Sequence, residues 1–124
     1  MNFNDDPRGL NHKVDLAKLE WKTGTLQQLQ RKELLNVDNG TVKLIKILPQ
    51  QTYPEHFHPN HTEYAFVLSG KPLIRIGGDE YLAQPNEFYI FPASTKHSIQ
   101  NHADDECVII LGSITNKQQS YDHY

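Results

Sequence analysis

Three histidines and one glutamate are spaced so that their side chains could bind a single metal ion. His56 and His58 are one residue apart, and Glu63 follows after four more residues. Side chains at positions i and i+2 of an extended segment project to the same face. The intervening Pro-Asn pair predicts a turn, so Glu63 would open the following strand, and His97 would arrive from a later strand. Imidazole and carboxylate ligands together suit Fe, Mn, Ni, Zn or Cu rather than Ca or Mg.

One divalent ion held by these four side chains would keep free coordination positions. A six-coordinate ion would have two left for water, substrate or dioxygen, and an open position distinguishes a catalytic metal from a structural one. His61 is the alternative to consider, because it shares strand parity with Glu63 and could replace it or hydrogen-bond to a ligand. The spacing favours Glu63 as the ligand and His61 as an exposed turn residue.

Further motif residues accompany the ligands. Gly70 follows Glu63 after six residues, and Pro92, His97 and Asn101 are separated by four and three residues. Together these positions resemble the two motifs of the cupin family, G-x5-H-x-H-x3,4-E-x6-G and G-x5-P-x-G-x2-H-x3-N. The resemblance covers residues 41–113 and includes the complete ligand set.

Three motif glycines are replaced in this chain, by Gln50, Asn86 and Ser94. After glycine, asparagine is the residue that best tolerates the left-handed backbone conformation, so Asn86 is a mild departure. Ser94 fits that conformation less well, and it predicts a turn of different geometry.

The resemblance implies an all-β fold, a single-domain cupin jelly-roll β-barrel with a short irregular N-terminal extension. Short apolar runs separated by turn residues, with almost no helical period, independently favour a sandwich or barrel. Asp38-Asn39-Gly40 predicts a hairpin turn. We expect strands at 41–48, 64–68, 73–76, 81–83, 88–91 and 107–111, and a less regular, bulged strand within 25–35.

Three segments are expected along the chain: an N-terminal extension at 1–20, the cupin domain at 21–115 and a polar tail at 116–124. Residues 14–21 could form either a helical turn or a first strand. Trp21 at the end of this stretch is expected to pack against the barrel.

No catalytic residue can be assigned from the sequence, but three side chains are candidate substrate contacts. Arg75 lies between two isoleucines; directed inward it could clamp a substrate carboxylate, whereas ordinary strand alternation favours an outward, solvated arginine. Tyr53 and Tyr89 are candidate pocket residues that could equally serve in packing. An inward Glu63 would place Ala65 and Val67 on the same inner face.

Composition bounds the remaining function classes. A net charge of −3 over 124 residues, with no Lys/Arg cluster, argues against nucleic acid as a partner. No apolar window approaches a membrane span, so a cytoplasmic protein without membrane contact is expected. The single Cys107 excludes an internal disulfide and a thiolate zinc site, and it is expected to be a small buried hydrophobe.

Two functions follow from the resemblance and the open coordination positions. The first is a small metal-dependent enzyme, dioxygenase-like or an isomerase or lyase, acting on a small organic molecule. The alternative is a non-catalytic, metal-dependent ligand-binding or sensor module, because the stretch from Leu19 to His58 is similar to the ChrR-like cupins. A metal-free barrel is disfavoured by the complete ligand set. Unpaired sheet edges also predict a homodimer, with the region from Trp21 to Leu35 in or near the interface.

Overall fold

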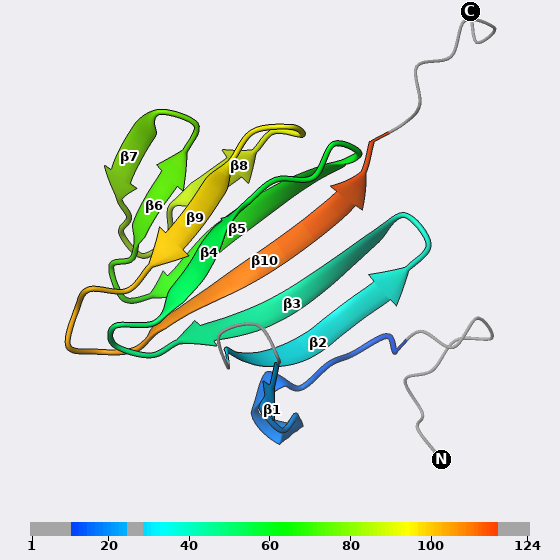
Figure 1. Cartoon of the computed structure of the whole chain (residues 1–124). Coiled ribbons are helices and arrows are strands. Elements are labelled where there is room, and N and C mark those ends of the chain that lie inside the picture. Colours follow the sequence, from blue (N-terminus) through cyan, green and yellow to red (C-terminus); the bar gives the residue numbers. More distant parts are fainter. Residues whose placement is uncertain (1–10, 25–28, 117–124) are drawn as a thin grey trace, which may run out of the picture.

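The computed structural model describes residues 11–24 and 29–116 of the chain, which form two antiparallel sheets (Figure 1). Strands follow one another in a six-stranded sheet of order β1-β2-β3-β10-β5-β8 and a four-stranded sheet of order β4-β9-β6-β7. The strands are β1 (Lys22–Thr23), β2 (Gln30–Val37), β3 (Gly40–Ile47), β4 (Thr52–His56), β5 (His61–Ser69), β6 (Leu73–Ile76), β7 (Asp79–Leu82), β8 (Phe88–Phe91), β9 (His97–Gln100) and β10 (Cys107–Thr115).

The two sheets face each other across a shared apolar core, which confirms the all-β prediction. Ile45, Val67 and Ile109 of the larger sheet pack in one cluster with Ile74 and Ile99 of the smaller sheet. The chain passes from one sheet to the other at each connection from β3 to β10 except the one between β6 and β7, an alternation that is consistent with a jelly roll. Within the described residues no hydrogen-bonded ladder joins the two sheets. The predicted closed barrel is therefore a pair of facing sheets in this structure.

Strand alternation places the expected residues in this core. On β5, Glu63, Ala65 and Val67 are buried, whereas the alternating Tyr64 and Phe66 are only partly covered. The inner face predicted for this strand is confirmed. Glu63 is thus a charged residue on a face of β5 whose other buried side chains, Ala65 and Val67, are small and apolar. It lies where the core meets the candidate site.

Most of the strands predicted from apolar runs are confirmed, with small differences in length. β6 and β8 have the predicted bounds, and β3, β5, β7 and β10 overlap theirs. β2 contains the expected bulge, because its register against β3 shifts between Glu33 and Leu35. Residues 25–28 of that predicted strand lie outside the described residues.

The ambiguous stretch at 14–21 forms a helical turn, a 3-10 helix at Leu16–Lys18. The Asp15 side chain accepts a hydrogen bond from the Ala17 backbone amide (3.1 Å), which caps the turn. Trp21 packs on the outer face of the large sheet, where the ammonium groups of Lys32 and Lys46 lie 4.6 and 4.4 Å from its ring. Among the described residues, no helix has the length and apolar character needed to cross a membrane. The boundaries drawn at 20 and 116 stay a prediction.

Two strands that are not predicted from apolar runs, β4 and β9, carry two of the predicted ligands, His56 and His97. β4 and β9 are short and mostly polar, and they pair antiparallel with His56 directly opposite His97. β9 also pairs with β6, with His97 opposite Ile76. The neighbouring strands, rather than any hydrophobic pattern of their own, therefore hold these two segments in place.

The three residues that replace motif glycines all keep a left-handed backbone. Gln50, Asn86 and Ser94 have φ values of 68°, 74° and 63°, close to the 84° of Gly70. The expectation of a different turn geometry at Ser94 is wrong, because this residue adopts the conformation that glycine favours. Such a conformation costs a non-glycine residue about 1–2 kcal/mol.

Gly70 is needed for close approach as well as for its φ. A Cβ added there would overlap the side chain of Cys107 and lie 2.8 Å from its Cα. Cys107 is fully buried as predicted, and burial is the main reason that the pKa of its thiol is raised to about 11. The thiol is therefore a packed, protonated group.

Asn101, the last residue of the second motif, ties loops together. Its buried amide donates to the carbonyls of Ile47 (2.8 Å) and Asp105 (2.9 Å), and its side-chain oxygen accepts from the Ala103 amide (3.0 Å). These bonds connect the end of β3 with the loop between β9 and β10. Asn101 thus supports the framework instead of contacting the metal ligands.

The left-handed backbone of Ser94, in the turn before β9, leads to a prediction about stability. Ser94→Gly should raise the free energy of unfolding by about 0.5–1 kcal/mol, since relief of the backbone penalty exceeds the entropy that glycine gains in the unfolded chain. Ser98→Gly, within β9, is the matched control and should lower that free energy. Urea unfolding measures both, and a destabilised Ser94→Gly variant would contradict the assigned backbone conformation.

Candidate metal centre

Side chains from three strands converge between the two sheets. His56 ends β4, His97 begins β9 and Glu63 lies on β5 of the opposite sheet, and one ligand atom of each lies within 4.8 Å of the others. One carboxylate oxygen of Glu63, Oε1, is 2.7 Å from His97 Nε2 and 3.2 Å from His56 Nε2. The two imidazole rings lie 4.2 Å apart between centroids. The structure therefore brings together three of the four predicted ligands in one tight group.

Backbone carbonyls orient both rings. Nδ1 of His56 donates to the Pro54 carbonyl (2.7 Å), and Nδ1 of His97 donates to the Thr95 carbonyl (3.1 Å), because a carbonyl oxygen can only accept. A neutral ring would then have its Nε2 lone pair free for a metal ion on the side that faces Glu63, whereas a protonated ring donates from Nε2 to the Glu63 carboxylate. Fixing the tautomer in this way is how metal-binding histidines are usually prepared.

The electrostatics of the group favour a charged Glu63. Burial acts to raise the pKa of this carboxyl, but hydrogen bonds from His56 and His97 outweigh burial and lower the pKa to about 2. Burial likewise acts to lower the pKa of His56, whereas its bonds to Glu63 and Pro54 raise the pKa overall. The site therefore holds a carboxylate in a place where positive charge is stabilised.

The donor set and its spacing fit a transition-metal ion. Two ligand atoms that are about 2.1 Å from one ion and at right angles to each other lie about 3 Å apart. The contacts of 2.7 and 3.2 Å from Glu63 to the two imidazoles match that separation. Two nitrogens and a carboxylate oxygen suit Fe, Mn, Ni, Zn or Cu.

His58, the fourth predicted ligand, stands beside the group. Its Nε2 is 3.8 Å from Glu63 Oε1, and its side chain is 43% exposed, compared with 22% for His56. β4 ends at His56, so the two-residue period that was expected to align both histidines stops before His58. The His58 carbonyl accepts from the Ser94 amide (2.9 Å), which keeps the segment near the site. Ligation by His58 stays a prediction.

His61 lies farther out. It opens β5, and its ring contacts that of His58 at 5.7 Å between centroids. It does not belong to the tight group formed by the described residues. The expectation of an exposed turn residue is wrong, because His61 is the first residue of β5 and is half-buried.

Aromatic rings enclose the two buried histidines. Phe91 stacks on His97 with a centroid distance of 4.3 Å and an interplanar angle of 2°. Tyr53 meets His56 edge-on at 4.8 Å. Burial, and then the nearby charge of Glu63, raises the pKa of Tyr53 to about 12, so its hydroxyl keeps its proton at neutral pH.

The other two predicted substrate contacts lie away from the group. Arg75 and Ser98 are opposite each other and face away from His97, and the Arg75 side chain donates to exposed Glu80 (2.7 Å). This is the outward arginine that strand alternation favours. Tyr89 is on the inner face, but its hydroxyl donates to Glu87 (2.6 Å) rather than facing the ligands.

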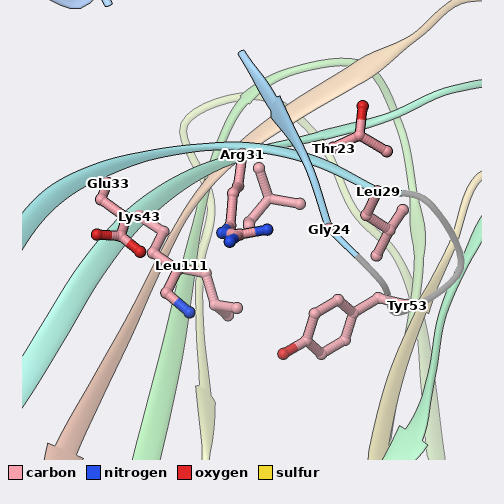
Figure 2. Close-up of a pocket in the computed structure, with 9 residues that line it drawn as sticks. Thr23, Gly24, Leu29, Arg31, Glu33, Lys43, Tyr53 and Leu111 are labelled. Carbon is pink, nitrogen blue, oxygen red and sulfur yellow. The ribbon is translucent and has the colours of Figure 1, made fainter. Parts of the chain in front are cut away.

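A cavity of about 340 Å³ opens on the other side of Tyr53 (Figure 2). It does not include the metal-binding group itself; the Tyr53 ring contributes to both, because it lines the cavity and contacts His56. Two of the charged side chains that line it, Arg31 and Lys43, are not among the predicted substrate contacts. Their signal in the sequence is a cation within the alternating part of a strand, the same signal that Arg75 gives. The lining is Thr23, Gly24, Leu29, Arg31, Glu33, Lys43, Ile45, Tyr53 and Leu111.

Comparison with known proteins gives a consistent result. The family model described as a Cupin domain matches residues 43–112, more than half of the chain. The polyketide synthase CurC of Streptomyces cyaneus is 22% identical over 101 residues, which cover 79% of this chain and 66% of that protein. The chain spans about two thirds or less of the length of the curated relatives that it matches.

Two solved structures show the same fold. A predicted oxalate decarboxylase of Thermotoga maritima superimposes with a TM-score of 0.78 at 14% identity, over 83% of this chain and 98% of that one. A sugar phosphate isomerase of the cupin superfamily from Silicibacter pomeroyi superimposes with a TM-score of 0.75 at 18% identity, over 84% and 76% of the two chains. At these identities the likeness concerns the fold alone.

The geometry predicts how metal binding depends on each side chain. Glu63→Gln and His97→Ala should each weaken binding of Mn or Zn by more than about 100-fold, since loss of a mere outer partner of a ligand typically costs about 10–100-fold. His58→Ala should cost less, because that side chain is more exposed. Metal titration followed by calorimetry measures these affinities.

His61→Ala is the matched control and should leave the affinity unchanged. Circular dichroism establishes that each variant is folded. Undiminished metal binding by folded Glu63→Gln would contradict the assignment of this group as the metal centre.

Proposed function

Because the chain belongs to the cupin family, we propose that it is a metal-dependent enzyme acting on a small organic molecule. The observation that carries this proposal is a buried carboxylate that meets imidazole nitrogens from the opposite sheet, next to an open cavity. His56, Glu63 and His97 would hold one divalent transition-metal ion, and His58 would complete the set. When bound, such an ion supplies Lewis-acid activation of a substrate oxygen or, if it is iron, a site for dioxygen.

The chain's own residues prepare this chemistry. The carbonyls of Pro54 and Thr95 hold the two rings in one tautomer. Phe91 covers one face of His97 and keeps water from that side, since both residues are almost fully buried. The Tyr53 ring lies between the cavity and His56, and its protonated hydroxyl faces the cavity, where it can donate a hydrogen bond to a bound substrate.

These features favour isomerase or lyase chemistry over a dioxygenase reaction. In both of the former, negative charge develops on an oxygen beside the reacting carbon, and the protonated Tyr53 hydroxyl can donate a hydrogen bond to that oxygen. Two of the similar folds are named as a decarboxylase and an isomerase. Dioxygenase-like turnover, and ligand binding without turnover in a sensor, are the outcomes that experiment must separate. The cytoplasmic location stays a prediction.

Turnover by the metal-loaded protein tests the reaction class. Among small hydroxy acids, keto acids and sugar phosphates, at least one should be converted without consumption of dioxygen, as measured by product NMR and an oxygen electrode. Tyr53→Phe should lower kcat by about 100-fold or more while KM changes little, because the hydroxyl acts in the reaction step.

Tyr89→Phe is the matched control and should retain kcat, since its hydroxyl bonds to exposed Glu87. Oxygen uptake coupled to product would favour the dioxygenase alternative. Saturable binding without any product across the panel would favour the sensor.

We also propose that the protein is a homodimer formed through the outer face of the six-stranded sheet. Apolar side chains lie directly opposite one another across β8, β5 and β10, as in the pairs Ile90 with Tyr64 and Phe66 with Ile110. Phe88, Ile90 and Ile114 are 54%, 56% and 52% exposed. A contiguous apolar surface of this kind indicates an interface, and a twofold axis would set it against its own copy. Its members are Leu35, Val42, Tyr64, Phe66, Leu68, Phe88, Ile90, Ile110 and Ile114.

This surface refines the interface expected at 21–35. Leu35 belongs to it, opposite Val42 of β3. Trp21 is outside it, because Lys32 and Lys46 occupy the space over its ring. The centre of the proposed interface is therefore β5 with its two neighbouring strands.

Sedimentation velocity at micromolar concentration should show a dimer for the wild type and a monomer for Ile90→Lys, because an unpaired charge at an apolar interface costs several kcal/mol. Leu82→Lys is the control, on an exposed residue of the other sheet (63%). A monomeric wild type, or equal loss of dimer in both variants, would contradict the proposal.

A further inference from the structure

Two cations on the inner face of the large sheet, Arg31 and Lys43, lie outside the candidate metal centre. Arg31 on β2 is opposite Ile45, a core residue of β3, and Lys43 is opposite Leu111 of β10. Residues directly opposite in a ladder share a face, so both cations belong to the face that carries the core. Figure 2 shows the guanidinium of Arg31, the ammonium of Lys43 and the hydroxyl of Tyr53 directed toward the same space.

In contrast to Arg31 and Lys43, the cations on the outer face of β2 and β3 contact other groups of the protein. Lys32 donates to the Leu16 carbonyl (2.8 Å), and Lys46 lies over Trp21 and 3.8 Å from the carboxylate of Glu106. Neither Arg31 nor Lys43 makes an ion pair or side-chain hydrogen bond with any residue in the described ranges 11–24 and 29–116. Two half-buried, unpaired cations on an apolar face are costly unless they have an anion to bind.

The surroundings of Arg31 leave its guanidinium open toward the cavity. A Cβ at Gly24 would lie only 2.7 Å from Arg31 Nη1, so the glycine allows the guanidinium to lie against the backbone. Gly24 is itself held by a hydrogen bond from its amide to the Leu29 carbonyl (2.8 Å). This arrangement limits the positions of the guanidinium, and a planar guanidinium recognises a carboxylate through two parallel hydrogen bonds.

Charge and lining together define the ligand class. Arg31 and Lys43 supply two positive charges, and exposed Glu33 beside Lys43 supplies one negative charge, which leaves one net positive charge. This balance suits a singly charged carboxylate better than a doubly charged phosphate. The remaining lining includes Leu29, Ile45, Leu111 and the Tyr53 ring, so the cavity also accommodates an apolar carbon body.

We propose that the cavity binds the carboxylate end of a small organic acid, with Arg31 and Lys43 holding the carboxylate and the apolar lining holding the carbon body. Tyr53 is the wall that this cavity shares with the metal centre, so the bound acid would extend past Tyr53 toward the ligands. Its identity as the substrate rests on the proposed function, whereas its binding does not.

Benzoate is the probe, because it joins one carboxylate to an apolar ring. Calorimetry should show that benzoate binds the full-length protein, and that Arg31→Gln and Lys43→Gln each weaken binding by about tenfold or more. Arg31→Lys should weaken it less than Arg31→Gln, since the charge is kept and the planar fork is lost. Arg75→Gln removes an equal charge elsewhere in the fold and should leave the affinity within about twofold of wild type.

Two further compounds separate the contributions of ligand charge and ligand shape to binding: benzamide lacks the charge of benzoate, and inorganic phosphate lacks its apolar ring. Benzamide has nearly the same size without the charge and should bind at least about tenfold more weakly. Equal binding of benzamide, equal or tighter binding of phosphate, or an equal effect of Arg75→Gln and Arg31→Gln would each overturn the carboxylate site.

The same titrations, run on metal-free and metal-loaded protein, separate this inference from the proposed function. Tight metal binding without any benzoate binding would overturn the carboxylate site and leave the metal centre standing. Benzoate binding that depends on Arg31 in a protein unable to bind metal would support the carboxylate site and overturn the enzymatic proposal.

Discussion

The burial of one carboxylate constrains this structure more than any other single interaction. Glu63 lies on a strand face that is otherwise small and apolar, and removal of an ionised carboxyl from water costs several kcal/mol unless it is compensated. The compensation comes from His56 and His97 on the opposite sheet. The two sheets must therefore face each other in a register that brings β4 and β9 over β5.

The turns that precede the ligands carry part of the cost of this arrangement. Gln50 comes six residues before His56, and Ser94 three residues before His97, and both adopt a left-handed backbone that does not suit their side chains. Strained residues persist where the surrounding structure determines the local conformation, and they gather near functional sites. At Ser94 the surrounding structure includes the hydrogen bond from its amide to the His58 carbonyl. The backbone of one ligand segment thus helps to hold the turn that leads to the other.

The inner face of the large sheet serves three purposes along its width. Apolar residues of β3, β5 and β10 form the core, Glu63 completes the candidate metal centre, and Arg31 and Lys43 line the cavity. Tyr53 connects the last two, because one edge of its ring meets His56 while its hydroxyl faces the cavity (Figure 2). A ligand anchored by charge in the cavity would have Tyr53 as its nearest contact with the metal centre. Under this proposal the cavity would add selectivity to a candidate metal centre whose own donor set does not specify a substrate.

The amino-acid sequence by itself determined the all-β class, most of the strands and three side chains that meet in the candidate metal centre, His56, Glu63 and His97, because alternation and ligand spacing are local properties. Only the tertiary structure decided where the polar strands β4 and β9 pair, since they have no hydrophobic pattern of their own. The tertiary structure also decided that His58, beyond the end of β4, lies farther from Glu63 than His56 does. It decided as well that Arg75 faces outward and that Arg31 faces inward. A strand's period of two separates its residues into two faces but does not say which face meets the core. That choice belongs to the neighbouring strands, and for a polar strand it is made entirely by them.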